Sequence, residues 1–249
     1  TQSRSSAASD VYKRQTLFSA LEGKKILIHG GGKHATLLAS KLGIVSKIIA
    51  GRRITDAENL EVITMVYGGL VNKKIVAKLQ AFQIDAIGLT GADANSIRAE
   101  KRPVTKIDFG FVGDVKAVNS NVINKLITAD LTPVFCAITH DGNGQLLNTN
   151  ADTVASQVAI GMSERYDTAL YYCFELEGVL RDFNDKTSIV QQIDAKTYEK
   201  LLITGVITDG MIPKLDNCFD ALRSGVSRVH IGSTGMLSKD NDKFTTITL

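Results

Sequence analysis

A glycine-rich turn between an apolar strand and a helix is the feature that most constrains this fold. The stretch KKILIHGGGKHATLLASKLG begins at Lys24, and residues 25–29 predict a strand that runs into three consecutive glycines. Residues 33–42 then read as a helix. Bare backbone at a helix N-terminus attracts anions in open α/β folds. The turn could hold a dinucleotide, a nucleotide phosphate or a carboxylate, and this stretch alone does not choose among them.

Apolar strands and helical segments alternate along the rest of the chain. Further strands are expected at residues 46–51, 85–91, 132–138, 168–174 and 227–232, and a β-hairpin over 104–118. Helices are expected over 55–82, 151–166 and 195–202 and after Pro213, the last of them ending at Gly225. Thr55 and Glu58 have the spacing of a capping box. This alternation predicts an open, mainly parallel sheet with helices on both faces.

Composition excludes several classes of protein. The 249 residues are 44% hydrophobic with a net charge of +3, and no basic run follows the first fifteen residues, which argues against nucleic-acid binding. No apolar run reaches membrane-spanning length and the N-terminus lacks a signal-peptide core. Cys136, Cys173 and Cys218 are far apart without metal-type spacing, so we expect them to be reduced and buried. We therefore expect a cytoplasmic protein with no membrane partner and no protein-held metal.

The glycine turn departs from both common nucleotide-binding fingerprints. A dinucleotide fold needs G-x-G-x-x-G and an acidic residue about twenty positions later, where this chain has Arg52 and Arg53. A Walker A loop needs four residues between its glycines followed by Lys-Ser/Thr, which is also missing. A nicotinamide oxidoreductase is therefore disfavoured, and an anion at the helix N-terminus or a merely tight turn remains.

Three other loops carry polar groups at the edges of predicted elements. The pair Arg52–Arg53 suits a carboxylate or phosphate, although such arginines are often only solvated. The other two loops are LLNTNADT, with Asn148, Asn150 and Asp152, and ITDGMIPK, with Thr208, Asp209, Gly210 and Lys214. Turn and cap chemistry would explain either of them alone. Four such elements in one α/β chain favour a binding site.

Taken together these segments resemble the amino-acid kinase family, and specifically its N-acetylglutamate kinases. The matching pieces occur in the family's order over about residues 16–235: HGGGKHATLLASKLGI, GRRITDAENLEVITMVYGGLVNKKIVAKL, GLTGAD, GFVGDV, GQLLNTNADT and GVITDGMIPKL. The resemblance implies a three-layer αβα sandwich, usually a homodimer, that transfers a phosphoryl group from ATP with Mg²⁺ to the side-chain carboxylate of an N-acylglutamate in arginine biosynthesis. It implies an acylglutamate-binding lobe over 16–165 and an ATP-binding lobe over 166–249. Acetyl and succinyl substrates both remain open.

The resemblance also assigns roles to residues by position. Asp152 would position catalytic lysines, and Lys214 would stabilise the transferring phosphoryl group. The implied substrate contacts are Gly31, Gly32, Arg53, Asn148 and Asn150. The implied nucleotide contacts are Glu175, Gly178, Leu180, Thr208, Asp209, Gly210, Met211 and Ile212. His29 is expected to be structural, near the substrate loop. Glu175 stands where the family commonly has an aspartate, so that loop departs from the family pattern.

The N-terminus departs most from the family. Family members open with a strand that ends in Lys-x-Gly-Gly, whose lysine reaches the ATP phosphates, whereas residues 1–15 read TQSRSSAASDVYKRQ. We expect residues 1–15 to be a foreign or disordered segment that replaces the first strand. This predicts that the chain as written is inactive or folds poorly. The alternative function is a catalytically inactive relative that binds a ligand or a partner.

Overall fold

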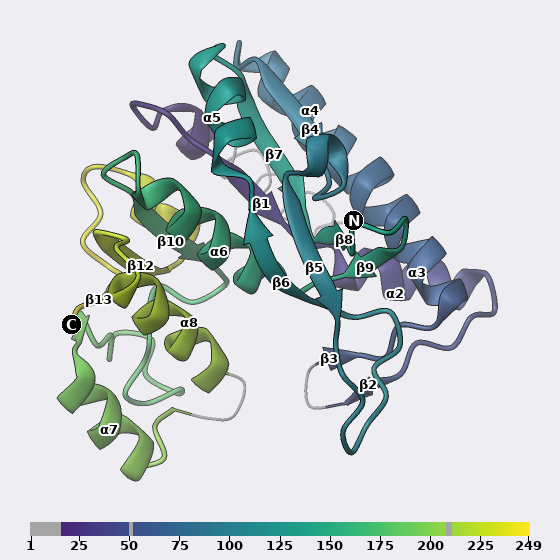
Figure 1. Ribbon diagram of the computed structural model, residues 1–249. Coiled ribbons are helices and arrows are strands. Elements are labelled where there is room, and N and C mark those ends of the chain that lie inside the picture. The colour runs from purple at the N-terminus through teal and green to yellow at the C-terminus, as the bar shows by residue number, and fades with distance from the viewer. Residues whose placement is uncertain (1–15, 50–51, 208–210) are drawn as a thin grey trace, which may run out of the picture. The chain divides into compact units, whose positions relative to one another are not determined.

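The computed structural model describes residues 16–49, 52–207 and 211–249 and divides the chain into two compact units (Figure 1). One unit contains Lys24–Gly161, and the other contains Met162–Leu249 together with residues 16–23. Residues 1–15, Ala50, Gly51 and 208–210 lie outside the described residues, and the prediction that 1–15 replaces a first strand falls there.

A parallel three-stranded sheet forms the centre of the unit Lys24–Gly161. Its order is β1 (Leu27–His29), β7 (Thr132–Cys136) and β4 (Ala86–Leu89). Every residue of β7 is buried. A parallel strand covered on both faces must be apolar along its whole length, which explains why TPVFC reads as a continuous apolar run.

Helices cover both faces of this sheet. A continuous helical segment precedes β4 and consists of α3 (Ala57–Thr64), the π-helix η1 (Met65–Val71) and α4 (Asn72–Ala81). Helix α5 (Ser120–Thr128) precedes β7, and Figure 1 shows it on the side of the sheet opposite α4. The chain moves outward from β1 to β4 and then back to β7. Right-handed crossovers of opposite direction place their helices on opposite faces.

A second sheet in this unit contains the strand that ends at Asn148. Its order is β6 (Gly113–Val118), β5 (Ile97–Lys101), β8 (Ile138–His140) and β9 (Leu146–Asn148). The hairpin predicted over 104–118 is wrong in its bounds, because β5 lies at 97–101 and residues 102–112 connect it to β6. The remaining elements here are α2 (Gly32–Lys41), β2 (Ile48–Ile49), β3 (Arg52–Arg53), η2 (Asp93–Asn95) and α6 (Ala151–Ser163).

The predicted capping box at the start of α3 is also wrong. Asp56 is the N-cap residue, and its carboxylate accepts the Asn59 N–H at 2.8 Å. Thr55 is instead fully buried and hydrogen-bonds elsewhere. Both residues favour N-cap positions, so spacing alone could not decide between them.

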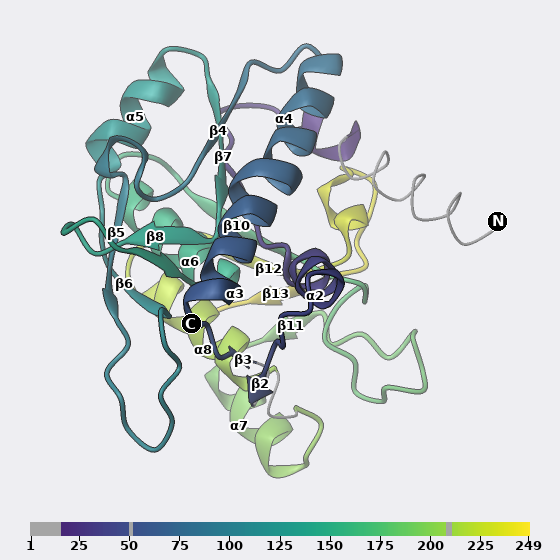
Figure 2. The same cartoon turned by 90° about the vertical axis from the view of Figure 1, so that its right-hand side faces the viewer.

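The other unit contains a mixed four-stranded sheet (Figure 2). Its order is β10 (Ala169–Cys173), β12 (Arg228–Gly232), β13 (Thr245–Ile247) and β11 (Gln192–Ile193), with β10 and β12 parallel. Its helices are α7 (Ala195–Ile203), α8 (Ile212–Arg223) and the short η3 (Thr234–Leu237). Pro213 lies in the first turn of α8, and Gly225 follows its end with φ +100°, as predicted.

The predicted α/β class, with parallel strands and covering helices, is confirmed. Within the described ranges, β1 pairs with β7 alone and β10 pairs with β12 alone. Both β1 and β10 therefore have one edge without a neighbouring strand. Cys136 and Cys218 are buried as predicted, whereas the prediction for Cys173 is wrong because it is exposed at the end of β10. No described helix is long and apolar enough to cross a membrane.

We predict that Thr245 stabilises the loop between β10 and β11. Its buried hydroxyl accepts the Val179 N–H at 2.8 Å and donates to the Val190 carbonyl at 2.7 Å. Thr245→Val should lower the free energy of unfolding by about 2–4 kcal/mol, because two buried backbone groups lose a partner. Urea denaturation measures this. Thr248→Val, which removes only a solvent-exposed hydrogen bond from Gln192, is the control and should change stability by less than about 0.5 kcal/mol. Equal effects of the two substitutions would contradict this role.

Candidate functional site

The glycine turn exposes the N-terminus of α2. Gly31 is its N-cap residue, no side chain caps the helix, and its first turn contains no acidic residue. The first backbone hydrogen bond of α2 runs from the Ala35 N–H to the Gly31 carbonyl, so the preceding amides have no acceptor within the helix. A Cβ built on Gly30 would lie 3.7 Å from the Ala151 Cβ, which places the turn beside the start of α6. Two helix N-termini therefore meet here, and both favour negative charge.

The Arg53 side chain lies against this turn. Its Nη2 donates to the Gly32 carbonyl at 3.2 Å and to Thr36 Oγ1 at 2.6 Å. Its Nη1 is buried and has no hydrogen-bond partner among the described residues. A buried guanidinium nitrogen without an acceptor is costly, and an anionic ligand would satisfy it. Neighbouring Arg52 is exposed.

One backbone segment connects the Arg53 strand with Asn148. Thr55 exchanges hydrogen bonds with Phe109 and Phe111, at 2.9 and 2.7 Å, and the Asn148 N–H donates to the Phe111 carbonyl at 2.9 Å. Gly110 lies between these contacts with φ +70°, and a Cβ there would lie 2.2 Å from the Thr55 carbonyl oxygen. Only glycine fits this close approach.

The Asn148 side chain strengthens the same connection. Its Nδ2 donates to Thr55 Oγ1 at 3.0 Å, and the Asn148 residue is 9% exposed. Asn148 thus fixes the strand that carries Arg53 and brings its own amide to the same region.

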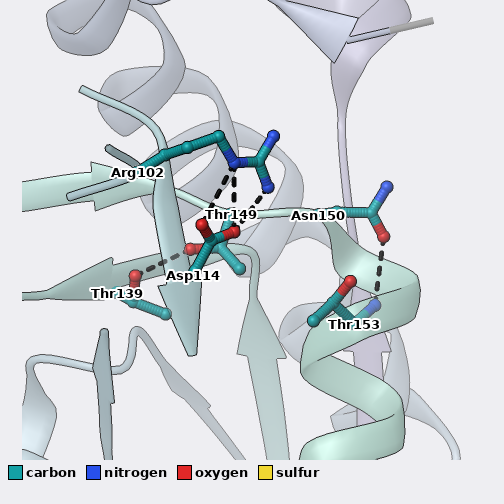
Figure 3. A network of polar contacts seen from close by, with 6 residues as sticks. All are labelled: Arg102, Asp114, Thr139, Thr149, Asn150 and Thr153. Carbon is teal, nitrogen blue, oxygen red and sulfur yellow. Dashed lines mark hydrogen bonds and ion pairs between the residues drawn. The ribbon is translucent and has the colours of Figure 1, made fainter. Parts of the chain in front are cut away.

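The turn from β9 into α6 carries the other predicted polar residues. Asn150 Oδ1 accepts the Thr153 N–H at 3.0 Å and caps α6, and Figure 3 shows its amide nitrogen pointing away from the helix. The Thr149 hydroxyl hydrogen-bonds that of Thr139 at 2.7 Å, which anchors the turn on β8 (Figure 3). Asp152 lies in the first turn of α6. Asn150 therefore performs the cap role and still offers two donors.

An ion pair supports this turn from β6. Figure 3 shows Arg102 bonded to Asp114 through two of its nitrogens, beside the Thr139–Thr149 pair. A two-pronged guanidinium–carboxylate pair fixes the orientation of both side chains.

His29 fixes the strand that leads into the glycines. Its Nδ1 donates to the Gly30 carbonyl at 2.8 Å, so its Nε2 must accept the Asn72 Nδ2 at 3.1 Å. The Asn72 Nδ2 also donates to the Val134 carbonyl at 2.9 Å. Burial lowers the pKa of His29, while its hydrogen bond to Gly30 opposes this shift. The imidazole is therefore neutral and structural.

The predicted nucleotide residues lie in the unit Met162–Leu249. Met211 is the N-cap of α8 and Ile212 is its first residue, while Thr208, Asp209 and Gly210 lie outside the described residues. Glu175 is exposed, whereas Gly178 and Leu180 are buried. A Cβ on Gly178 would lie 2.7 Å from Ile189 Cγ2, so packing alone requires this glycine.

Lys214 lies in the first turn of α8 above two aromatic rings. Its Nζ is 5.1 Å from the centroid of the Tyr172 ring and 5.9 Å from that of Phe174. Ring faces attract a cation without neutralising its charge.

The structure brings the five predicted substrate residues of the unit Lys24–Gly161 into one region, and Asp152 begins the adjacent helix. Lys214 and the nucleotide residues belong to the other unit. Sequence reasoning missed Thr36, Thr55 and Tyr67 as parts of this region. Thr36 follows Gly32 by one helical turn, and this spacing could have placed it beside the glycine turn. Tyr67 belongs to an apolar helical segment, and nothing in the sequence distinguishes it from a core residue. Across the described part of the chain, no three His, Cys, Asp or Glu side chains are grouped to hold a metal ion.

Comparison with known proteins assigns the family. The profile of the Amino acid kinase family matches residues 4–233. The chain belongs to the amino acid kinase family. Two relatives, both named acetylglutamate kinase, come from Bacteroides fragilis and Cytophaga hutchinsonii, with 54% and 57% identity. The first match covers 90% of this chain and 85% of the relative, and the second covers 86% and 81%. The resemblance to N-acetylglutamate kinases is thus confirmed.

A solved structure supports the same fold for this amino acid kinase. The structure of smu.665 from Streptococcus mutans UA159 matches with a TM-score of 0.76 and 26% identity, covering 90% of this chain and 85% of that one. The amino acid kinase fold expected from the motifs is confirmed.

We predict that His29 makes stability depend on pH. The pKa of His29 is lowered in the folded state, so the folded protein binds fewer protons than the unfolded chain below the ordinary value of about 6.5. The stabilising contribution is complete above about pH 6.5 and is lost as the pH falls toward the folded pKa. Urea denaturation at several pH values should show this loss.

Two histidine variants separate this effect from general acid destabilisation. His29→Gln should weaken the decline in stability below about pH 6.5, because the titrating group is removed. His34→Gln, at an exposed position of α2, is the matched control. The same pH profile in both variants would contradict the role of His29. Burial, assisted by Arg228, also lowers the pKa of His230, so part of the decline should remain.

Proposed function

We propose that this chain is an acetylglutamate kinase, which transfers the γ-phosphoryl group of ATP to the side-chain carboxylate of N-acetyl-L-glutamate in arginine biosynthesis. The observation that carries the proposal is the buried, unpartnered Nη1 of Arg53 beside the uncapped N-terminus of α2. Such a site needs an anion, and a carboxylate matches the fork of a guanidinium group. The relatives from Bacteroides fragilis and Cytophaga hutchinsonii support the substrate.

In this proposal the substrate is held by the residues gathered around the glycine turn. Backbone N–H groups at Gly31 and Gly32 and the Arg53 guanidinium bind the anionic acylglutamate, and Asn148 and Asn150 add amide donors. The two helix N-termini contribute a favourable field for negative charge. The backbone contacts of Thr55 and Phe111 hold the strand of Arg53 and Asn148 together, so these two residues are oriented before the ligand arrives.

The proposed reaction needs no general base. The γ-carboxylate of the substrate is ionised at neutral pH, so one of its oxygens attacks the γ-phosphorus directly. A new O–P bond forms, the bond from the γ-phosphorus to the bridging oxygen breaks, and ADP leaves with that electron pair. The products are an acyl phosphate and ADP. The barrier comes from repulsion between anions, so positioning and positive charge supply the catalysis.

Lys214 is the proposed source of positive charge at the transferring group, and Asp152 is proposed to orient the catalytic cations. Glu175 to Leu180 and Thr208 to Ile212 are proposed to contact the nucleotide. Mg²⁺ would arrive on the ATP phosphates and offset their charge, and a Mg²⁺ site of this kind needs only one or two carboxylates from the protein. The absence of a three-ligand group in the described residues is therefore compatible with it.

We also propose the remaining properties that the resemblance implies. These are a homodimer in the cytoplasm, an acylglutamate lobe at 16–165, an ATP lobe at 166–249, and a foreign segment at 1–15. Sedimentation equilibrium tests the dimer, and a single monomer mass at micromolar concentration would contradict it.

ADP release, with N-acetyl-L-glutamate, ATP and Mg²⁺, tests the function. Trapping of the acyl phosphate with hydroxylamine identifies the product. In a version with a family-type strand in place of residues 1–15, we expect turnover that Lys214→Met lowers about a hundredfold, because one well-placed donor or cation contributes about 3 kcal/mol to the transition state. Arg223→Met, which removes an exposed arginine from the far end of α8, is the control. Absence of the acyl phosphate together with retained ligand binding would favour the inactive relative.

The same assay tests whether residues 1–15 impair the enzyme. The edge of β1 away from β7 and the edge of β10 away from β12 carry no strand among the described residues, and open parallel edges expose backbone donors and acceptors. A version in which a family-type strand with Lys-x-Gly-Gly replaces residues 1–15 should be more active than the chain as printed. Equal turnover of both would contradict the proposal that residues 1–15 impair the enzyme.

We predict that Arg53→Lys weakens the binding of N-acetyl-L-glutamate at least tenfold. Lysine keeps the charge but cannot place one nitrogen on Gly32 and Thr36 and another on the ligand. A hydrogen bond to a charged group is worth about 1.5–3 kcal/mol, which corresponds to roughly a 10- to 150-fold change in Kd. Calorimetric titration without ATP measures this Kd. Arg52→Lys, at the exposed neighbouring position, should leave it unchanged, and similar losses in both variants would contradict the assignment.

A further inference from the structure

The π-helix η1 places two side chains on β1 and the glycine turn. In an α-helix, residues five apart differ by about 140° around the axis and face different directions. In a π-helix, hydrogen bonds span five residues, so such residues lie nearly above one another. Tyr67 and Asn72 are five apart across η1, and they reach Gly31 and His29 respectively. π-turns of this kind occur frequently at functional sites.

The Tyr67 ring lies directly against the glycine turn. A Cβ built on Gly31 would lie 2.8 Å from Cδ1 and 3.0 Å from Cε1 of Tyr67. A Cβ on Gly32 would lie 3.8 Å from the Tyr67 hydroxyl oxygen. The ring therefore runs along Gly31 and its hydroxyl group reaches Gly32, at the first residue of α2.

The Tyr67 hydroxyl group has no acceptor in the described part of the chain. Tyr67 is only 7% exposed, and its hydroxyl oxygen forms no hydrogen bond with a described residue. The hydroxyl oxygen itself is not buried, so a ligand can reach it. Burial raises the pKa of Tyr67, although the nearby Arg53 charge opposes this shift, so the hydroxyl group is protonated at neutral pH and is a donor.

Three kinds of donor therefore surround Gly32 without acceptors to match them. They are the Tyr67 hydroxyl group, the buried Nη1 of Arg53 and the amide of Gly32, which has no acceptor within α2. A carboxylate has two oxygens with about four acceptor positions and could satisfy all three kinds together.

We propose that Tyr67 is a substrate-binding residue whose hydroxyl group donates a hydrogen bond to the carboxylate held by Arg53. This inference rests on the proposed function and adds a specificity residue to the same site. The ring supports Gly31, and the hydroxyl group distinguishes a ligand with a carboxylate at this position from a neutral one.

Tyr67→Phe tests the hydroxyl group alone, because it keeps the ring against Gly31. Titration of the full chain with N-acetyl-L-glutamate should show about a tenfold higher Kd, with an unchanged thermal midpoint. In the version with a family-type strand in place of residues 1–15, the KM for ATP and the kcat at saturating acylglutamate should also be unchanged. Tyr171→Phe, at an exposed tyrosine of β10, is the matched control. An unchanged Kd in Tyr67→Phe would overturn the proposal.

A substrate analogue shows whether the hydroxyl group contacts this carboxylate. N-acetyl-L-glutamate α-amide replaces the α-carboxylate with a neutral group, and the same replacement at the side chain gives N-acetyl-L-glutamine. With the analogue that lacks the Arg53-bound carboxylate, Tyr67→Phe should raise the Kd by much less than tenfold, because the carboxylate that would accept the Tyr67 hydrogen bond is already absent. A tenfold increase in Kd caused by Tyr67→Phe with both analogues would overturn the proposal.

The same titrations separate this inference from the proposed function. Binding of N-acetyl-L-glutamate by the parent chain, weakened by Arg53→Lys but not by Tyr67→Phe, would contradict the role of Tyr67 alone. Absence of binding by the parent chain, with its thermal midpoint intact, would contradict both.

Discussion

The candidate site depends on the close backbone contact between Thr55 and Gly110. This contact joins the strand of Arg53 to the segment Phe109–Phe111, which in turn bonds Asn148. Any side chain at Gly110 would overlap the Thr55 carbonyl oxygen. The close backbone approach therefore requires Gly110, the first glycine of GFVGDV. Arg53 and Asn148 are 95 positions apart in the sequence, and this contact, together with the hydrogen bonds of Asn148 to Phe111 and Thr55, makes them neighbours. The orientation of the anion-binding groups therefore follows from main-chain packing.

The electrostatics of the site suit a ligand that is charged before it binds. The Arg53 guanidinium, the Tyr67 hydroxyl group and the Gly32 amide are all donors, and His29, which precedes the glycines, is kept neutral by burial. An ionised carboxylate needs no proton removed, so donors alone can bind and align it. The same reasoning explains why no Ser-His-Asp or Cys-His arrangement is needed for the proposed phosphoryl transfer.

Much of the fold followed from the sequence because apolar strands, glycines and prolines carry local signals. The strand at Leu27–His29, the helix after the glycines, and Pro213 at the start of α8 all have such signals. The N-cap at Asp56 could not be predicted in this way, because Thr55 and Asp56 both favour an N-cap position. The backbone hydrogen bond between Thr55 and Phe111, which is made only in the folded chain, decides between them. The grouping of Gly31, Arg53 and Asn148 was predicted only through a family resemblance.

The π-turn shows why Tyr67 could not be predicted from the sequence. In MVYGGLV it reads as one more apolar position of a helix with ordinary periodicity. The change to five-residue hydrogen bonding accompanies the contacts of Asn72 with His29 in β1 and Val134 in β7, which are made only in the folded chain. Its two consequences are coupled, because the same turn that brings Asn72 to His29 brings Tyr67 to Gly31. A substitution that restored regular α-helical geometry would thus displace both supports of the glycine turn together.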